Sequence, residues 1–106
     1  MIGARLEVSV PNVPTDFRLG EARPNPFNPR TMISFDLPEA AEVRLAIYDI
    51  SGRLVRTLVR GTYPAGHHGV EWDGTAQSGS AVGSGVYFYE ISADQFRAGR
   101  RMILRR

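Results

Sequence analysis

The sequence contains no cysteine, no lysine and no long apolar run. Without cysteine the chain can form neither a disulfide nor a thiolate zinc site, and it has no thiol nucleophile. No apolar run approaches the ~20 residues of a membrane-spanning helix, so we expect no membrane span. A sustained 3.6-residue apolar period is also absent, which argues against long amphipathic helices and favours strands.

The length and composition predict one small folded domain. The chain has 106 residues, 42% of them hydrophobic and 23% charged, which is typical of a globular chain. Residues 1–10 lack an apolar stretch after a charged head, so we do not expect a signal peptide there. If the protein is exported, its signal would lie upstream.

The charge is unevenly distributed although the net charge is only +2. All 13 basic residues are arginine, and five of them fall in the last ten residues, where there is no acid. The chain therefore has a basic end on a mildly acidic body.

Turn-forming residues recur at short intervals, which predicts short antiparallel strands in a sandwich or barrel. We expect Ile33, Phe35 and Leu37 to face the core, with their neighbours outward. The strand over 54–60 does not alternate cleanly, which predicts a bulge or burial on both faces. The predicted strands cover residues 17–19, 31–37, 43–48, 54–60, 68–72, 86–93 and 96–104.

Connections and the core follow from the same pattern. We expect an extended, polyproline-like lead-in over 24–29, a loop over 61–66, a tight turn at Asp94 and Gln95, and an interruption of the last strand near Gly99. Residues 1–18 are interpreted as a spacer or the end of an upstream region, and 19–106 as the domain. The predicted core consists of Ile33, Phe35, Val43, Leu45, Ile47, Val70, Trp72, Tyr87, Tyr89, Ile91 and Met102.

Several motifs occur in a characteristic order. They are Pro-Asn-Pro-Phe-Asn-Pro at 24–29, Tyr-Asp at 48–49 with Gly-Arg at 52–53, Gly-His at 66–67, Trp-Asp-Gly at 72–74, Gly-Val-Tyr at 85–87, and Met102 before an Arg-rich end. This order resembles the type A C-terminal sorting domains of the type IX secretion system. It is also similar to the immunoglobulin-like domain of flagellar hook-capping proteins.

The resemblance implies an immunoglobulin-like antiparallel β-sandwich of about seven strands without catalytic machinery. Sorting domains lie at the C-terminus of secreted proteins and are recognised by outer-membrane export machinery. In many organisms a sortase-like enzyme then removes the domain and links the cargo to the cell surface. The implied partners are that machinery or enzyme and an upstream cargo domain, and the implied location is secreted or on the outer-membrane exterior.

Other chemistries find weaker support in the sequence. His67 and His68 would point to opposite faces of a strand and could not bind one metal unaided, so we predict neither metal nor cofactor. Aspartates at strand ends, such as Asp49 and Asp73, are expected to cap turns. The glycines over 79–85 lack the lysine and helix of a phosphate loop. Trp72 alternates with Val70, which places it in the core.

The basic end is the candidate interaction site. Arg100, Arg101, Arg105 and Arg106 are interpreted as partner-recognition residues, held by a strand whose Met102 and Leu104 face inward. A nucleic-acid partner is not predicted, because a strand with one solvated face explains the arginines more simply. The leading interpretation is a module for secretion or surface attachment. The alternative is a structural immunoglobulin-like domain for assembly or spacing, as in hook-capping proteins.

Overall fold

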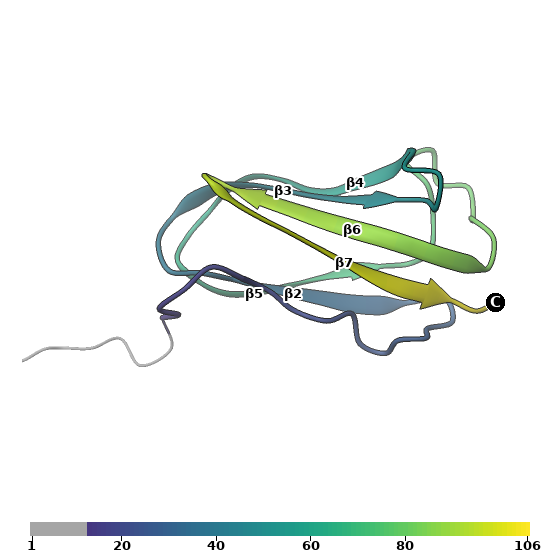
Figure 1. Cartoon of the computed structure of the whole chain (residues 1–106), viewed down its shortest axis with the longest axis horizontal. Helices are drawn as coiled ribbons and strands as arrows, with labels where there is room; N and C mark the ends of the chain where they lie inside the picture. Colours follow the sequence, from purple (N-terminus) through teal and green to yellow (C-terminus); the bar gives the residue numbers. More distant parts are fainter. Residues whose placement is uncertain (1–12) are drawn as a thin grey trace, which may run out of the picture.

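The computed structural model describes residues 13–106, which form two antiparallel sheets packed face to face (Figure 1). One sheet has the order β1-β2-β5 and the other the order β4-β3-β6-β7. This arrangement confirms the predicted sandwich and its seven strands. The strands are β1 (Arg18–Leu19), β2 (Thr31–Leu37), β3 (Ala41–Tyr48), β4 (Leu54–Tyr63), β5 (Gly66–Trp72), β6 (Gly85–Ala93) and β7 (Phe96–Leu104).

No helix forms within residues 13–106, and so none there could cross a membrane. Residues 1–12, which include the segment where no signal peptide is expected and most of the predicted spacer, lie outside the described residues. At the boundary assigned to residue 18, Phe17 stacks on Phe96 and β1 begins with Arg18.

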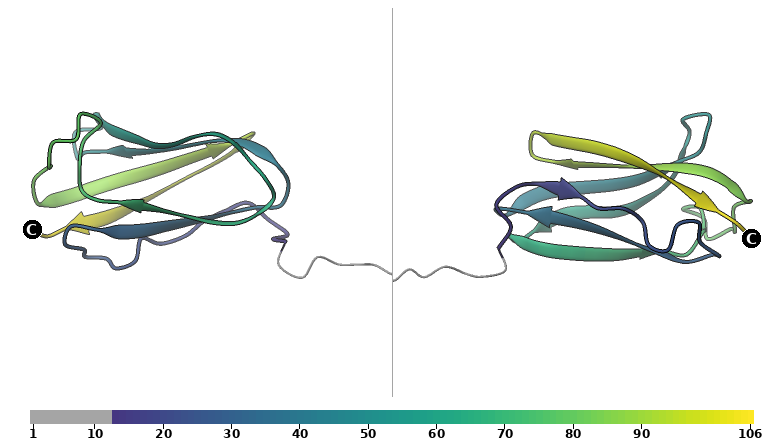
Figure 2. Two further views of the ribbon diagram at one scale, coloured as in Figure 1. Left: turned by 180° about the vertical axis from the view of Figure 1, so that it is seen from behind. Right: turned by 60° about the horizontal axis from the view of Figure 1, so that its bottom comes forward.

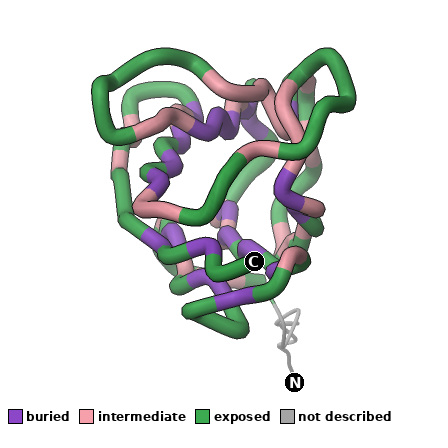
Figure 3. The backbone as a smooth tube through the Cα atoms, turned by 90° about the vertical axis from the view of Figure 1, so that its right-hand side faces the viewer, coloured by how far each residue is buried: buried purple, intermediate pink, exposed green. Residues whose placement is uncertain are grey.

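Alternation along the strands builds the core. In β2, every second residue from Thr31 to Leu37 is buried. Figure 3 shows the same alternation of buried and exposed residues along other strands. The predicted core residues are buried, except that Val70 is half-buried.

The predicted bulge occurs in β4, at two places. The pairing with β3 steps from Leu45–Val59 to Ala46–Thr57 and leaves Leu58 unpaired. A second step leaves Val55 unpaired. The extra residues explain why the apolar residues of this strand do not alternate cleanly.

Two connections differ from the predictions. The expected loop over 61–66 shrinks to Pro64 and Ala65, because Tyr63 pairs with Ala41 and Gly66 pairs with Leu37. The last strand is not interrupted, since Gly99 pairs in register with Glu90. The tight turn is confirmed, with Asp94 at φ 54°, a left-handed conformation that aspartate tolerates.

The lead-in over 24–29 is bent rather than extended like polyproline, and its peptide bonds before Pro24, Pro26 and Pro29 are cis. Phe27 enters the core and packs against Trp72, with ring centroids 5.7 Å apart. The sequence pattern does not predict the burial of Phe27. The segment then lies beside the C-terminal half of β7 (Figure 2).

Replacing Phe35 with alanine should lower the free energy of unfolding by about 3–5 kcal/mol. Phe35 is 1% exposed and its ring lies against His68 and Tyr63, so the truncation leaves a cavity between the sheets. Denaturant unfolding followed by tryptophan fluorescence measures the change. Met32→Ala is the matched control on the outer face of the same strand, at 47% exposure, and should cost less than about 1 kcal/mol. Equal losses for the two variants would contradict the assigned faces of β2.

Candidate interaction site at the C-terminal strand

The Arg-rich end of the chain consists of β7, the edge strand of the four-stranded sheet, and the two residues that follow it. Its pairing with β6 runs unbroken from Ala93–Phe96 to Gly85–Leu104. Met102 and Leu104 are buried, as predicted, and Arg101 and Ile103 face outward. The strand is therefore fixed by its inner face and displays its outer face.

The lead-in covers the last part of the free edge of β7. The amide N–H of Phe27 donates to the carbonyl of Ile103 at 3.0 Å, and the N–H of Arg105 donates to the carbonyl of Phe27 at 2.8 Å. The Asn25 side-chain oxygen accepts a hydrogen bond from the Ile103 N–H at 2.9 Å. These bonds satisfy main-chain groups that an edge strand would otherwise leave open.

Trp72 links this region to the loops at the same end of the sandwich. Its ring is buried between Phe27 and Tyr87, and its Nε1 donates to the carbonyl of Thr75 at 2.9 Å. The Tyr87 hydroxyl donates to the carbonyl of Gly83 at 2.7 Å. The predicted core role of Trp72 is confirmed, and the separate motifs meet at one structural cluster.

Arg106 fastens the end of the chain to the same loops. The guanidinium of Arg106 donates to the carbonyls of Val82 and of Gly74, the latter at 2.7 Å. The main-chain N–H of Arg106 donates to the Ser84 hydroxyl. Gly74 has φ +78°, and a β-carbon there would come within 2.9 Å of Arg106 Nη2 and 3.1 Å of the Pro29 carbonyl. Glycine is required at this position by both its backbone and its neighbours.

The four predicted recognition arginines divide into two pairs. Arg101 and Arg105 are exposed, and no hydrogen bond or ion pair holds their side chains within residues 13–106. Arg100 donates from Nε to the Leu19 carbonyl at 2.8 Å and lies 3.9 Å from Glu21, while Arg106 forms the contacts described above. Arg100 shares the inward parity of Met102 and Leu104, a signal already present in the sequence. Nothing in the sequence indicates the bonds of Arg106.

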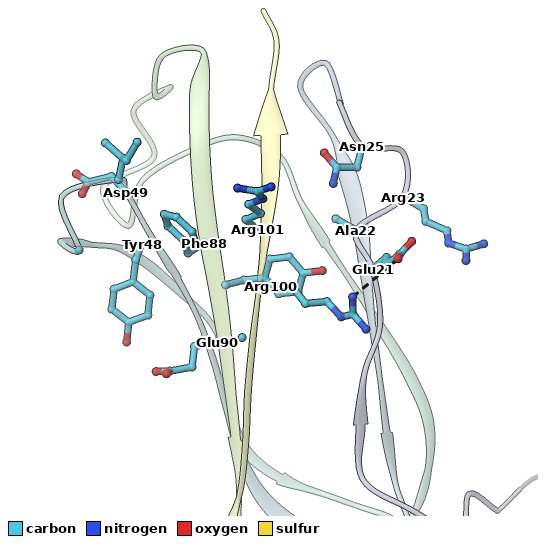
Figure 4. Close-up of a pocket in the computed structure, with 14 residues that line it drawn as sticks. Glu21, Ala22, Arg23, Asn25, Tyr48, Asp49, Phe88, Glu90, Arg100 and Arg101 are labelled. Carbon is cyan, nitrogen blue, oxygen red and sulfur yellow. Dashed lines mark ion pairs between the residues drawn. The ribbon is translucent and has the colours of Figure 1, made fainter.

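An open depression of about 1110 Å³ runs from the outer face of β6 and β7 to the lead-in (Figure 4). Phe88, Glu90 and Arg101 line its sheet side, and Glu21 and Asn25 line its other side. Sequence reasoning missed this depression because its residues come from separate segments that only the fold brings together.

The histidines occupy different environments. Nδ1 of His67 lies 2.7 Å from the Asp36 carboxylate at the surface, whereas His68 packs against Phe35 and Tyr63. No group of three metal-ligating side chains occurs among residues 13–106.

Asp49 and Asp73 cap turns, as predicted. Asp49 accepts hydrogen bonds from the N–H groups of Ser51 and Arg53, and Asp73 accepts one from the N–H of Thr75. The Thr75 hydroxyl bond, followed by the charge of Arg56, holds the pKa of Asp73 below its usual value. The Ser51 hydroxyl does the same to the pKa of Asp49. Burial raises the pKa of Tyr89, whose hydroxyl donates to the Gly20 carbonyl.

Comparison with known proteins identifies the fold and the motif cluster as an immunoglobulin-like module. The FlgD Ig-like domain family matches residues 25–96, and the chain belongs to this family. The basal-body rod modification protein FlgD of Escherichia coli K12 is 41% identical over 64 residues, which cover 59% of this chain and 28% of that protein. The match to the family ends at Phe96, so most of β7 lies beyond it.

Solved structures share the same sandwich. FlgD from P. aeruginosa has a TM-score of 0.57 and 28% identity, covering 71% of this chain and 60% of that one. Dimeric latent PorU from Porphyromonas gingivalis has a TM-score of 0.66 and 22% identity, covering 79% of this chain and 9% of PorU. PorZ, a surface component of the type IX secretion system of the same organism, has a TM-score of 0.56 and 22% identity, covering 85% and 11%. The chain therefore corresponds to one part of each of these proteins.

Arg106→Gln should lower the free energy of unfolding by about 1–2 kcal/mol, because two carbonyls lose a charged donor. Arg105→Gln removes the same charge from a side chain without such bonds and should change stability by less than about 0.5 kcal/mol. Thermal and denaturant unfolding of the two variants provide the comparison. The assigned role of Arg106 is wrong if both variants unfold with the same midpoint.

Acidification should destabilise the protein partly through Asp73. Its pKa is lowered on folding, so its stabilising contribution is present above the unfolded value of 3.8 and disappears as the pH falls through the lower folded value. When the pH is lowered from 5 to below 3, the unfolding midpoint should therefore fall less in Asp73→Asn than in the wild type. Glu39→Gln, at an exposed turn position, is the control and should retain the wild-type slope.

Proposed function

We propose that this chain is a non-catalytic attachment module of a larger exported bacterial protein, with the exposed face and end of β7 recognised by a partner at the cell envelope. The observation that carries the proposal is the fixation of the chain end. Phe27, Asn25 and Arg106 hold residues 103–106 in one conformation, while Arg101 and Arg105 remain exposed beside them. A fixed strand with free guanidinium groups suits recognition of carboxylate or phosphate groups, because little ordering is required on binding.

The sorting form of this proposal draws on the resemblance to type IX sorting domains and on the shared fold of PorU and PorZ. In it, export machinery or a sortase-like enzyme binds the module, and the upstream cargo is carried to the outer-membrane exterior. The module contributes shape and charge, and the chemistry belongs to the partner.

Assembly as in flagellar hook-capping proteins is the second candidate. The family match over residues 25–96 and the relationship to FlgD favour it. Under this alternative the sandwich packs against other subunits and the basic end of β7 needs no receptor. The two candidates therefore differ in whether residues beyond Phe96 are needed for recognition.

A reporter fusion distinguishes them. Residues 13–106, placed after a signal peptide and a reporter enzyme in a host with type IX secretion, should bring the reporter to the cell surface or medium. Arg101→Gln/Arg105→Gln should reduce export about ten-fold, since each exposed charged contact contributes up to about 1 kcal/mol. These two positions are chosen because replacing Arg106 would also loosen the chain end.

Arg44→Gln/Arg60→Gln is the matched control, with the same loss of charge on β3 and β4. Its export should equal that of the wild type. If the wild-type fusion accumulates in the periplasm although the domain is folded, the sorting proposal is wrong. If both double variants are exported as well as the wild type, recognition does not depend on the charges of Arg101 and Arg105.

A further inference from the structure

Part of the edge of β7 remains uncovered. The two-residue turn makes Ala93 and Phe96 a hydrogen-bonded pair, and alternate residues of β7 then bond to β6. The odd-numbered residues turn their N–H and C=O groups away from β6. Ile103 and Arg105 follow this rule, because their outward groups bond to the lead-in.

Arg97, Gly99 and Arg101 have the same parity, but the lead-in does not bond to them. No backbone hydrogen bond from another described segment reaches these three residues, and β6 is the sole neighbour of β7 in its sheet. They present a short row of open donors and acceptors, which is the template required for addition of another strand.

The depression gives access to this row. Gly99 and Arg101 line it from β7, and Glu21 and Arg23 line it from the segment between β1 and the lead-in. Figure 4 shows the side chain of Arg100 crossing between these two segments, where it meets Glu21. Arg100 also bonds to the Leu19 carbonyl, so its side chain is held in place next to the open edge of β7.

The side chains along the row favour an acidic ligand. Arg97 and Arg101 face outward at both ends of it, and Gly99 between them leaves a gap beside Glu90. No acidic residue follows Asp94 in the sequence. Glu21 and Glu90 in the same depression would repel a continuous row of phosphates, which argues for a peptide with separated charges rather than for a nucleic acid.

We propose that residues 97–101 bind an extended partner segment as an added strand, with carboxylates facing Arg97 and Arg101 and an aromatic side chain over Gly99. Side chains on one face of a strand recur at every second residue, so the segment has the pattern acidic-x-aromatic-x-acidic. An aromatic ring packs readily over a glycine on a neighbouring strand. This inference rests on the proposed function and specifies the chemistry of the partner.

The probe is a capped heptapeptide, Thr-Glu-Thr-Tyr-Thr-Glu-Thr, whose palindromic order suits either strand direction. Titrated into the whole 106-residue chain, it should give saturable NMR shift changes at the amides of Gly99 and Arg101 and slow their hydrogen exchange. Binding should weaken at high salt, because the contacts are exposed ion pairs. A version N-methylated throughout keeps the charges, loses every backbone donor and should not bind.

Two variants test the two parts of the site. Arg97→Gln/Arg101→Gln should weaken peptide binding about ten-fold through the loss of two exposed pairs. Gly99→Pro should abolish it, because proline removes an outward N–H while sparing the bonds to β6. Arg60→Gln, on the opposite edge strand, is the control and should bind like the wild type. Unfolding midpoints verify that each variant is folded.

Equal binding of the N-methylated peptide, or wild-type affinity in Arg97→Gln/Arg101→Gln, would overturn strand addition. Tighter binding of a single-stranded DNA 12-mer than of the peptide would do the same and would identify a nucleic-acid surface. Unchanged export of a folded Gly99→Pro fusion would also reject this site while leaving the proposed function intact. Failure of wild-type export would instead reject the proposed function, whatever the peptide does.

Discussion

The two backbone hydrogen bonds that join Phe27 to Ile103 and to Arg105 are the contact on which this end of the sandwich depends. They join the segment that leaves the three-stranded sheet to the edge strand of the four-stranded sheet. The same residue places its ring against Trp72, so main-chain pairing and core packing reinforce each other. Through Trp72 and Tyr87 the contact extends to the loops that hold Arg106.

This arrangement divides β7 into two parts that differ in how far their edge is covered. Beyond residue 102 the edge is covered and the chain end is held, whereas residues 97–101 keep an open edge and an outward basic face. In the attachment module proposed above, the held part would fix the position of the open part. The arginines differ for the same reason: Arg100 and Arg106 bond to main-chain carbonyls, and Arg97, Arg101 and Arg105 are exposed.

Local pattern predicted most of the fold. Alternation located the inner faces of β2, β3, β6 and β7, and its failure in β4 indicated the bulges. The pattern could not show that residues 61–66 are largely paired, since that depends on partners distant in the sequence. The lead-in was misjudged for a related reason, because proline chemistry describes the backbone but not the attraction of Phe27 to Trp72.

The candidate site was predicted only in part. The basic charge of the C-terminal strand and the burial of Met102 and Leu104 were evident from the sequence. The bonds of Arg106 and the depression beside β7 were not, because each joins segments that the sequence separates widely. Such contacts carry no periodic signal, and they emerge only when two sheets are packed together.

The direction of the lead-in relative to β7 has a mechanical consequence. The described chain enters the sandwich at one end and leaves at the other, and Phe27 pairs with Leu104 in a parallel bridge (Figure 1). Tension between the two ends would slide these segments past each other, so the bonds of Asn25, Phe27 and Arg100 would bear the load together. Under pulling, these hydrogen bonds would be loaded in shear and would have to break together rather than one after another.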